Sequence, residues 1–487
     1  MKSGINNIDW NFDNSYSKLP DSFKENIKPV KVRNPELVLL NEDLAKELDL
    51  NFSNLEKDKL SALFAGNILP QDSNSIAQAY AGHQFGHFTM LGDGRAVLIG
   101  EHLSKNKNRH DIQFKGSGKT AFSRNGDGRA AIGPMLREYI ISEAMYHLGI
   151  PTTRSLAVVK TGENIIRETT LKGAILTRIA SSHIRVGTFQ YISARNKKDE
   201  LELLFDYVIN RHYPDIKESK NKAIALLKIV LNRQVNLVTN WMRVGFIHGV
   251  MNTDNMSISG ETIDYGPCAF MDIYDPKTVF SSIDKMGRYA YCNQPIITKW
   301  NLSRFAECLI PLIDNDQNKA IEIATEVINS FEKIYEEKWL HMMRDKLGLF
   351  DNEKKDKSLI LDLLTWMHQN NVDYTNTFCH LMDNEIKKDL KYDDEVFINW
   401  KKRWKNRLKT KNIIPEKSIR LMRNTNPIVI PRNHKVEEAL KSAEESDLKP
   451  INEILKVLRK PYTKQKDIFD YQIPKLTKEK YQTFCGT

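Results

Sequence analysis

The chain is poor in cysteine, with five in 487 residues. No two of them form a C-x-x-C pair, so the sequence contains neither a zinc ribbon nor a thioredoxin-type redox motif. The number is odd and the chain is long, which argues against a small disulfide-stapled scaffold. A stable fold must therefore come from an ordinary apolar core, and a hydrophobic content of 41% is enough to build one.

Long apolar runs are also missing. No stretch approaches the roughly 18 consecutive apolar residues that a membrane helix needs. Residues 1–20 have no apolar core of a signal peptide, and Asp9 and Asp13 count against a transit peptide. We therefore expect no membrane partner and a cytoplasmic location.

Charge of one sign is present only in slight excess. Lys and Arg together number 72 against 62 for Asp and Glu, a net charge of +10. Such an excess favours phosphate-bearing ligands in a general way but does not indicate a nucleic-acid binder. The most basic stretch, residues 400–411, carries Trp400, Trp404 and Leu408 four residues apart, which predicts a helix buried on its Trp face. A nucleic-acid patch there is the alternative, and we do not expect one.

The pattern divides the chain into four regions. Residues 1–75 form an N-terminal leader with little periodicity. Residues 76–185 contain strands around one helix, residues 186–300 are mainly helical with an irregular stretch at 248–267, and residues 301–487 form a Lys-rich helical extension. Within the second region the predicted order is strand, strand, helix, strand, strand, over 95–100, 110–115, 134–148, 154–160 and 173–179.

Two apparent motifs fail on inspection. Gly116-Ser-Gly-Lys-Thr120 resembles the end of a P-loop, but the pattern requires Gly at the position of Gln113. His83 and His87 have the spacing of a zinc protease, but Gln84 stands where the catalytic Glu should be.

A kinase-like constellation lies in the irregular stretch. A kinase catalytic loop places Asn seven residues after His, and His248 and Asn255 have that spacing. Nine residues later comes Asp264-Tyr-Gly266, at the position of the kinase D-F-G. In kinases this Asn and this Asp hold metal ions that bridge the nucleotide phosphates, and such oxygen ligands suit Mg²⁺ or Mn²⁺.

The same pattern predicts a strand Lys paired with a helix Glu, and Lys115 and Glu138 fit. One position departs from it. The kinase catalytic Asp should fall at residue 250, which is Val250, and Val cannot accept a proton. Asp254 is the nearest carboxylate that can take over. The site is therefore that of a kinase whose chemistry has changed or has been lost.

Additional cations and glycine-rich turns accompany this constellation. Gly92-Asp-Gly-Arg95 and Gly126-Asp-Gly-Arg129 are turns of the kind that let a backbone approach a ligand closely. Arg178 and Arg185 flank the end of the last predicted strand. Together with Lys115 they predict a phosphate site.

With these residues in view, the sequence resembles the selenoprotein O family of kinase-like protein adenylyltransferases. The resemblance runs along most of the chain, and its motifs together are highly specific. They are Ala79-Tyr-Ala-Gly-His-Gln-Phe-Gly86, Leu91-Gly-Asp-Gly-Arg95, Ser123-Arg-Asn-Gly-Asp-Gly-Arg129, Leu148-Gly-Ile-Pro-Thr-Thr-Arg154, His248-Gly-Val-Met-Asn-Thr-Asp-Asn255, Asp264-Tyr-Gly-Pro267 and Pro431-Arg-Asn-His434.

The resemblance implies an α+β fold, two-lobed and protein-kinase-like, with an N-terminal leader and a helical C-terminal extension. It implies transfer of AMP from ATP to Ser, Thr or Tyr hydroxyls of proteins, including the enzyme itself, with release of pyrophosphate. Asp254 would be the general base, and Asn255 and Asp264 would bind Mg²⁺ or Mn²⁺. Transfer of UMP from UTP and a nucleotide-binding pseudokinase scaffold remain the alternatives.

The resemblance also assigns the residues that contact the nucleotide. The phosphates would be held by Lys115, Arg178 and Arg185, with Glu138 orienting Lys115 and with Asp264 acting through the metal. The remaining nucleotide contacts would be Gly92, Gly94, Arg95, Asp127 and Gly128.

Cys485 matches a near-terminal Cys of that family, which is selenocysteine in some animal relatives. The family implies a redox link, in which this Cys forms a disulfide with the segment after the D-x-G motif. Many relatives have a Cys about sixteen residues past that Asp, where this chain reads Val279-Phe-Ser-Ser282. A bond from Cys485 to Cys268 is one candidate, and the partner stays open.

Overall fold

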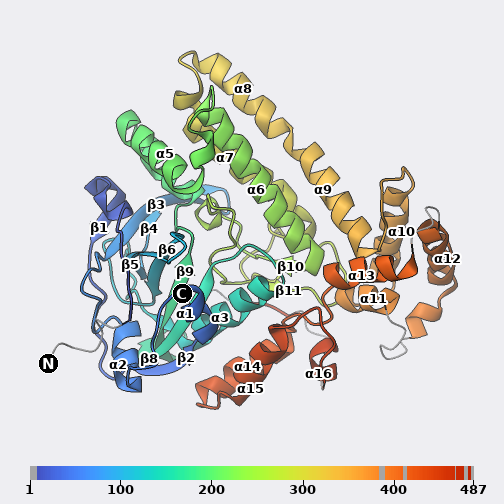
Figure 1. The fold of residues 1–487 in the computed structure, drawn as a ribbon, viewed down its shortest axis with the longest axis horizontal. Helices are drawn as coiled ribbons and strands as arrows, with labels where there is room; N and C mark the ends of the chain where they lie inside the picture. The colour runs from blue at the N-terminus through green and yellow to red at the C-terminus, as the bar shows by residue number, and fades with distance from the viewer. Residues whose placement is uncertain (1–7, 383–389, 410–413, 467, 476–480, 484–487) are drawn as a thin grey trace.

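The computed structural model describes residues 8–382, 390–409, 414–466, 468–475 and 481–483. Within them, one large antiparallel sheet occupies one end of the molecule and helices build the rest (Figure 1). No helix of this described part is both long and apolar enough to cross a bilayer.

The sheet has nine strands. Its main path runs β1-β3-β5-β6-β9-β8-β2, while β4 pairs with β3 and β7 pairs with β9. The strands are β1 Lys24–Asn26, β2 Glu36–Leu40, β3 Ile76–Gln84, β4 His87–Gly92, β5 Ala96–Leu103, β6 Arg109–Lys115, β7 Ala130–Ala131, β8 Arg154–Ile166 and β9 Thr170–Ala180. The four strands predicted from the sequence are β5, β6, β8 and β9. The hairpin β3–β4 is an addition to that prediction, and it contains His83 and His87.

Both faces of the sheet are covered, as strand β9 shows. Ile175 packs in a core cluster with the helices α1 Glu42–Glu47 and α2 Lys57–Phe64, whereas Leu176 packs in another with α3 Ile132–His147. Successive side chains of a strand point to opposite faces, so a strand buried on both sides has a continuous apolar run. Residues 1–75 thus contribute edge strands and the helical cover of one face.

Helix α3 is the one predicted over 134–148. Pro134 lies in its first turn, and Gly149 ends it with φ +72°, donating its N–H to the Tyr146 carbonyl at 2.9 Å. This left-handed conformation costs glycine little, which explains the sharp helix end. Glu138 thereby lies in the middle of a helix packed on β8 and β9.

The helical part begins directly after the sheet. Its first helices are α4 Val186–Ser193, α5 Lys198–His212, α6 Lys222–Val244, α7 Gln294–Ile313, α8 Gln317–Asn329 and α9 Phe331–Lys346. Between α6 and α7 lie a short antiparallel strand pair, β10 Phe246–Ile247 with β11 Ala269–Phe270, two 3₁₀ turns at Thr253–Asn255 and Tyr291–Asn293, and irregular chain. The kinase-like motif therefore lies in a loop region between two long helices.

The C-terminal helices form two groups (Figure 1). One group lies at the far end of the molecule and comprises α10 Asp356–Gln369, α11 Tyr374–Met382, α12 Glu395–Lys409 and α13 Pro415–Thr425. The other comprises α14 Asn433–Glu444 and α15 Lys449–Leu458, which pack on α3, and the short α16 Phe469–Gln472. In α12 the rings of Trp400 and Trp404 are buried, which confirms the predicted apolar stripe.

Candidate functional site

The ion pair predicted between a strand Lys and a helix Glu is present. Lys115, the last residue of β6, places its Nζ 2.7 Å from Oε2 of Glu138 in α3. Arg178 of β9 contacts the other oxygen of the same carboxylate, with its Nη2 2.5 Å from Oε1. Glu138 is 1% exposed, and burial alone would raise its pKa. Arg178 and Lys115 outweigh that cost and hold the pKa of Glu138 below its usual value.

Asp264 joins the same network from the irregular chain after β10. Its Oδ1 lies 2.9 Å from Nζ of Lys115 and 2.6 Å from Nη2 of Arg178, and its Oδ2 lies 2.8 Å from Nη1 of Arg185. Burial would raise its pKa, but the three cations keep the pKa of Asp264 well below the ordinary Asp value. Three cations from three elements therefore converge on one carboxylate.

Asp254 has a different environment, although Arg185 is also close to it. The Asp254 side chain is buried, and its Oδ1 has no hydrogen-bond partner within the described residues. Arg185 donates to the backbone carbonyl of Asp254 at 2.8 Å. Burial raises the pKa of Asp254 to about 6, with Arg185 opposing that shift. A buried carboxylate that has a raised pKa and one oxygen without a partner is suited to accept a proton near neutral pH.

Asn255 follows Asp254 in a single 3₁₀ turn, Thr253–Asn255. Its Nδ2 donates to the carbonyl of Val250 at 2.9 Å, which leaves Oδ1 as the acceptor of the amide. His248, which begins the motif, is buried under the stacked ring of Trp241 and bonds through Nε2 to the Ile263 carbonyl at 2.8 Å. His248 therefore fixes the shape of the loop and does not line the cavity described below.

The first glycine-rich turn lies against the loop that leads to the second. A Cβ added at Gly94 would lie 2.7 Å from the carbonyl oxygen of Phe122, so the turn at 92–95 lies directly against the loop that precedes Asp127. Asp127 itself pairs with Arg167, whose Nη1 donates to Oδ2 at 2.9 Å and whose Nη2 donates to Oδ1 at 3.0 Å. The hydrogen bonds from Arg167 lower the pKa of Asp127.

These residues surround one cavity of about 1010 Å³. All the predicted site residues line it except Glu138, which lies buried behind Lys115: they are Gly92, Gly94, Arg95, Lys115, Asp127, Gly128, Arg178, Arg185, Asp254, Asn255 and Asp264. Val250, at the position of the kinase catalytic Asp, lines it too. The lining carries seven Lys or Arg side chains and four Asp side chains, an excess of positive charge that suits a polyphosphate.

Sequence reasoning missed several lining residues. Arg185 is flanked by Tyr80, whose ring lies 4.4 Å from the guanidinium carbon, and by Asp93, which in turn accepts from Gln113 at 3.2 Å. Asp93 stands inside the quoted Gly92–Arg95 turn, so the motif itself carried the signal. Tyr80 and Gln84 come from the hairpin β3–β4 and likewise stand inside a quoted motif, Ala79–Gly86, although no chemical reason singled them out.

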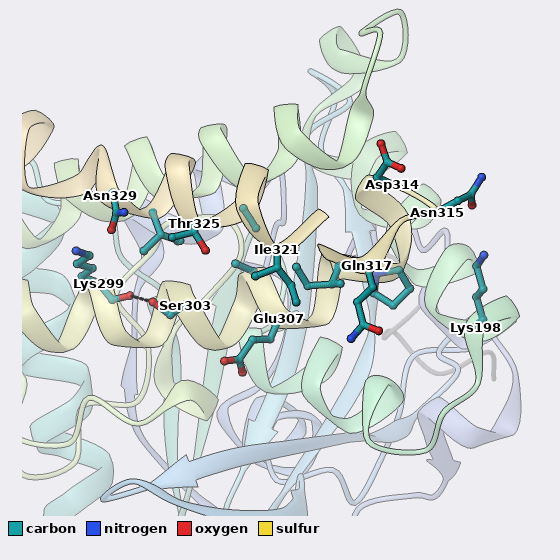
Figure 2. Close-up of a pocket in the computed structure, with 15 residues that line it drawn as sticks. Lys198, Lys299, Ser303, Glu307, Asp314, Asn315, Gln317, Ile321, Thr325 and Asn329 are labelled. Carbon is teal, nitrogen blue, oxygen red and sulfur yellow. Dashed lines mark hydrogen bonds between the residues drawn. The ribbon is translucent and has the colours of Figure 1, made fainter. Parts of the chain in front are cut away.

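A second large hollow lies away from this site, in the groove between α7 and α8 (Figure 2). It measures about 880 Å³ and has a floor of small and aliphatic side chains, with Lys299 and Asn329 near one end and Lys198 and Gln317 near the other. None of the predicted site residues lines it. The predicted site residues therefore line the cavity at the sheet and not this groove.

The described residues do not by themselves provide a full set of metal ligands. Among the described residues there is no group of three or more His, Cys, Asp or Glu side chains placed to hold a metal ion. Asn255 and Asp264 provide one amide oxygen and one carboxylate beside a polyphosphate-sized cavity. This donor set fits a hard divalent cation whose remaining ligands are phosphate oxygens and water.

The predicted disulfide falls partly outside the described residues, because Cys485 is not among them. Cys268 is buried, and burial raises the pKa of its thiol to about 12. Thr483 lies against the segment after the D-x-G motif, where its N–H donates to the Phe280 carbonyl at 2.7 Å. That neighbourhood contains Ser281 and Ser282, and the pairing of Cys485 stays a prediction.

Comparison with known proteins covers almost the whole chain. Residues 6–459 match the sequence model of a family described as "Protein adenylyltransferase SelO". A protein of Pelagibacter ubique named protein nucleotidyltransferase YdiU is 63% identical over 481 residues, covering 99% of this chain and 100% of that protein. Proteins of the same name from Nitrosococcus oceani and Bacillus cereus are 56% and 55% identical, over 99% of this chain and 98% and 99% of their own lengths.

Proposed function

Because the chain belongs to the SelO family of protein adenylyltransferases, we propose that it transfers AMP from ATP to Ser, Thr or Tyr hydroxyls of proteins. It is a protein nucleotidyltransferase. One observation supports the finer assignment above the others: a cavity rich in Lys and Arg also contains Asp254, a buried carboxylate with an unpaired oxygen. The cations suit the triphosphate, and the carboxylate suits an acceptor hydroxyl.

We also propose that the fold is kinase-like, with an N-lobe over 76–185 and a C-lobe over 186–300. The pairing of Lys115 in β6 with Glu138 in α3 supports this assignment, as does the position of the Asn255 and Asp264 loop between α6 and α7. Residues 301–487 would then be an extension that braces both lobes. Two ion pairs are consistent with that role: Arg432 pairs with Asp272 of the C-lobe at 2.6 Å, and Glu437 pairs with Arg137 of the N-lobe at 2.5 Å.

The reaction follows from these positions. The acceptor hydroxyl gives its proton to Asp254 while its oxygen attacks the α-phosphorus of ATP. The bond from that phosphorus to the β-phosphate oxygen breaks, and pyrophosphate leaves with the bonding electrons. Lys115, Arg178 and Arg185 stabilise the charge that develops on the leaving group. Val250 in place of the kinase Asp agrees with this scheme, because the acceptor approaches a different phosphorus from the one that a kinase attacks.

Asn255 and Asp264 would hold the Mg²⁺ or Mn²⁺. When bound, the cation neutralises phosphate charge as a Lewis acid. Glu138 keeps Lys115 in place, and the carboxylate of Asp264 would exchange its contacts with Lys115, Arg178 and Arg185 for ligation of that divalent ion. The three cations are thereby released to bind phosphate oxygens.

Position-specific labels of ATP test the proposal. The full chain is incubated with Mg²⁺ or Mn²⁺ and ATP labelled at either the α- or the γ-phosphorus, with the chain itself and casein as acceptors. We expect α-label on protein and γ-label in released pyrophosphate. Transfer of γ-label to protein would refute adenylylation and indicate a kinase. Unlabelled UTP competing better than ATP would favour transfer of UMP.

A pseudokinase scaffold is the second candidate, and Val250 in the cavity wall is the observation that favours it. The scaffold binds nucleotide without turnover. Calorimetric binding of ATP, combined with the absence of α-label on protein under both metals, would support the scaffold and contradict the transferase.

A further inference from the structure

The hairpin β3–β4 reaches from the sheet to the loop that carries Asp254. Its backbone is attached there twice: the N–H of His83 donates to Oγ1 of Thr253 at 2.7 Å, and the N–H of Phe85 donates to Oδ1 of Asn252 at 3.1 Å. The same oxygen of Asn252 accepts from the hydroxyl of Tyr289 at 2.6 Å, and the Phe85 ring lies 5.1 Å from the Tyr289 ring. The hairpin is therefore fixed on the residues that immediately precede Asp254.

Gly82 of this hairpin lies directly against the side chain of Asp254. A Cβ added at Gly82 would be 2.7 Å from Cγ of Asp254 and 2.8 Å from its Cβ. The second distance matters most, because the Cβ of Asp254 is fixed by the backbone and cannot move away by side-chain rotation. Either the carboxylate or the loop would have to shift by about 1 Å to reach an ordinary carbon–carbon contact.

The backbone conformation of Gly82 does not explain the glycine. Gly82 does not have a positive φ angle, and it pairs in register with Thr89 of β4 as an ordinary strand residue. Gly187, at the start of α4, also lies close to Asp254: a Cβ added there would collide with the Ala81 carbonyl and lie 3.3 Å from Cα of Asp254. Asp254 thus lies close to β3 and to α4 at two positions that have no side chain.

We propose that Gly82 is a positioning residue for the reaction, one that sets the place of the Asp254 carboxylate by leaving room for it. The inference rests on the proposed function, in which Asp254 accepts the proton of the acceptor hydroxyl. Gly82 does not line the cavity, whereas Lys115, Arg178 and Arg185, which would hold the phosphates, do. Its loss should therefore slow the chemical step and leave nucleotide binding intact.

The variant Gly82→Ala tests this proposal in the full chain. Initial rates of α-label transfer from ATP to casein give kcat and KM, and calorimetry gives the Kd for ATP. Displacement of a catalytic group by about 1 Å can lower the rate by about 100-fold. We expect a loss in kcat of that order, with KM and Kd for ATP unchanged. Gly133→Ala in α3 is the matched control, because its nearest atom would be Glu444 Oε1 at an ordinary 3.4 Å.

A double-mutant cycle separates positioning from general disruption. In the Asp254→Asn background, which keeps the shape of the side chain but cannot take the proton, Gly82→Ala should cause little further loss of the residual rate. An equal loss in both backgrounds would overturn the proposal, as would a wild-type kcat for Gly82→Ala. If Gly82→Ala fails to fold, Tyr289→Phe carries the test, because it removes the hydroxyl that donates to Asn252 beside the hairpin and should lower kcat several-fold at constant Kd. A Tyr289→Phe variant with the wild-type kcat would then overturn the proposal.

The outcomes also distinguish this proposal from the proposed function. A wild-type enzyme that transfers no α-label, or an Asp254→Asn variant with full activity, would refute the function assigned to the site and the role of Gly82 together. An inactive Asp254→Asn variant beside a fully active Gly82→Ala variant would refute the role of Gly82 alone.

Discussion

Replacement of Asp254 by Asn should stabilise the folded chain at neutral pH while it removes the transfer activity. In the protein without nucleotide or metal, burial raises the pKa of Asp254 to about 6 from an ordinary value of 3.8. A carboxyl whose pKa is higher in the folded than in the unfolded state makes folding less favourable once it ionises. This loss of folding stability is absent at a pH below both pKa values of Asp254 and reaches its full size above pH 6.

The magnitude follows from the size of this shift. About two pKa units correspond to about 3 kcal/mol at pH 8, since each unit is worth about 1.4 kcal/mol. At pH 5 most of the folded protein carries a protonated Asp254, and the cost falls to about half of that value. Asn is neutral and of similar shape, so Asp254→Asn should unfold at a higher temperature than the wild type at pH 8. The difference should narrow towards pH 5.

Differential scanning calorimetry of both proteins in EDTA, at several pH values between 5 and 8, measures this difference. Asp127→Asn provides a control of opposite sign, because the bonds from Arg167 lower the pKa of Asp127 and its charge stabilises the fold at neutral pH. The side chain of Asp127 is 45% exposed, so only a small destabilisation is expected. An Asp254→Asn variant that unfolds earlier than the wild type at pH 8, or a difference that does not change with pH, would refute the reasoning. In the same variant, α-label transfer should fall by about 10²- to 10⁴-fold, the usual contribution of a general base.

Three further predictions concern the network and the extension. Glu138→Gln leaves Asp264 as the only carboxylate paired with Lys115 and Arg178, so the Kd for ATP should rise and the temperature of unfolding should fall. Calorimetry measures both quantities. An unchanged Kd would contradict the orienting role of Glu138. Arg432→Met removes the buried cation that pairs with Asp272 and Asp373 and should destabilise the chain by about 3–5 kcal/mol in urea unfolding, while the KM for ATP of the folded fraction stays the same. Trp404→Ala should lower the free energy of unfolding by about 3–5 kcal/mol, because the packing of a buried ring is lost. Neither this variant nor the wild type should retain RNA in a binding assay at several salt concentrations. Retention that weakens with salt would support the alternative of a nucleic-acid patch.

Much of the local structure was predictable because it depends on neighbours in the chain. Strands β5, β6, β8 and β9 and helix α3 follow from alternation, from helical periodicity and from Gly149 as a helix stop. The leader was not predictable in this way, since β2 is short and finds its partner β8 about 120 residues later. Its place in the sheet depends on a tertiary pairing that no local pattern encodes.

The residues of the site were likewise predictable only in part. Motif spacing selected Asn255 and Asp264, the end of a predicted strand selected Lys115, and adjacency to Asn255 selected Asp254. Spacing could not select Gly82 or Tyr80, because both acquire their importance from contacts with residues more than 100 positions away.

The amino-acid sequence by itself determined which groups are available for the reaction: the cations, the two metal-ligand candidates and the carboxylate at position 254. Only the tertiary structure decided which of these groups are ionised, paired or buried. Asp264 is held ionised by the three cations that meet it from β6, β9 and the start of α4, whereas Asp254 is buried against Gly82 and is left with an unpaired oxygen. The physical reason is that desolvation and charge pairing depend on distances across the fold, and a sequence does not contain those distances.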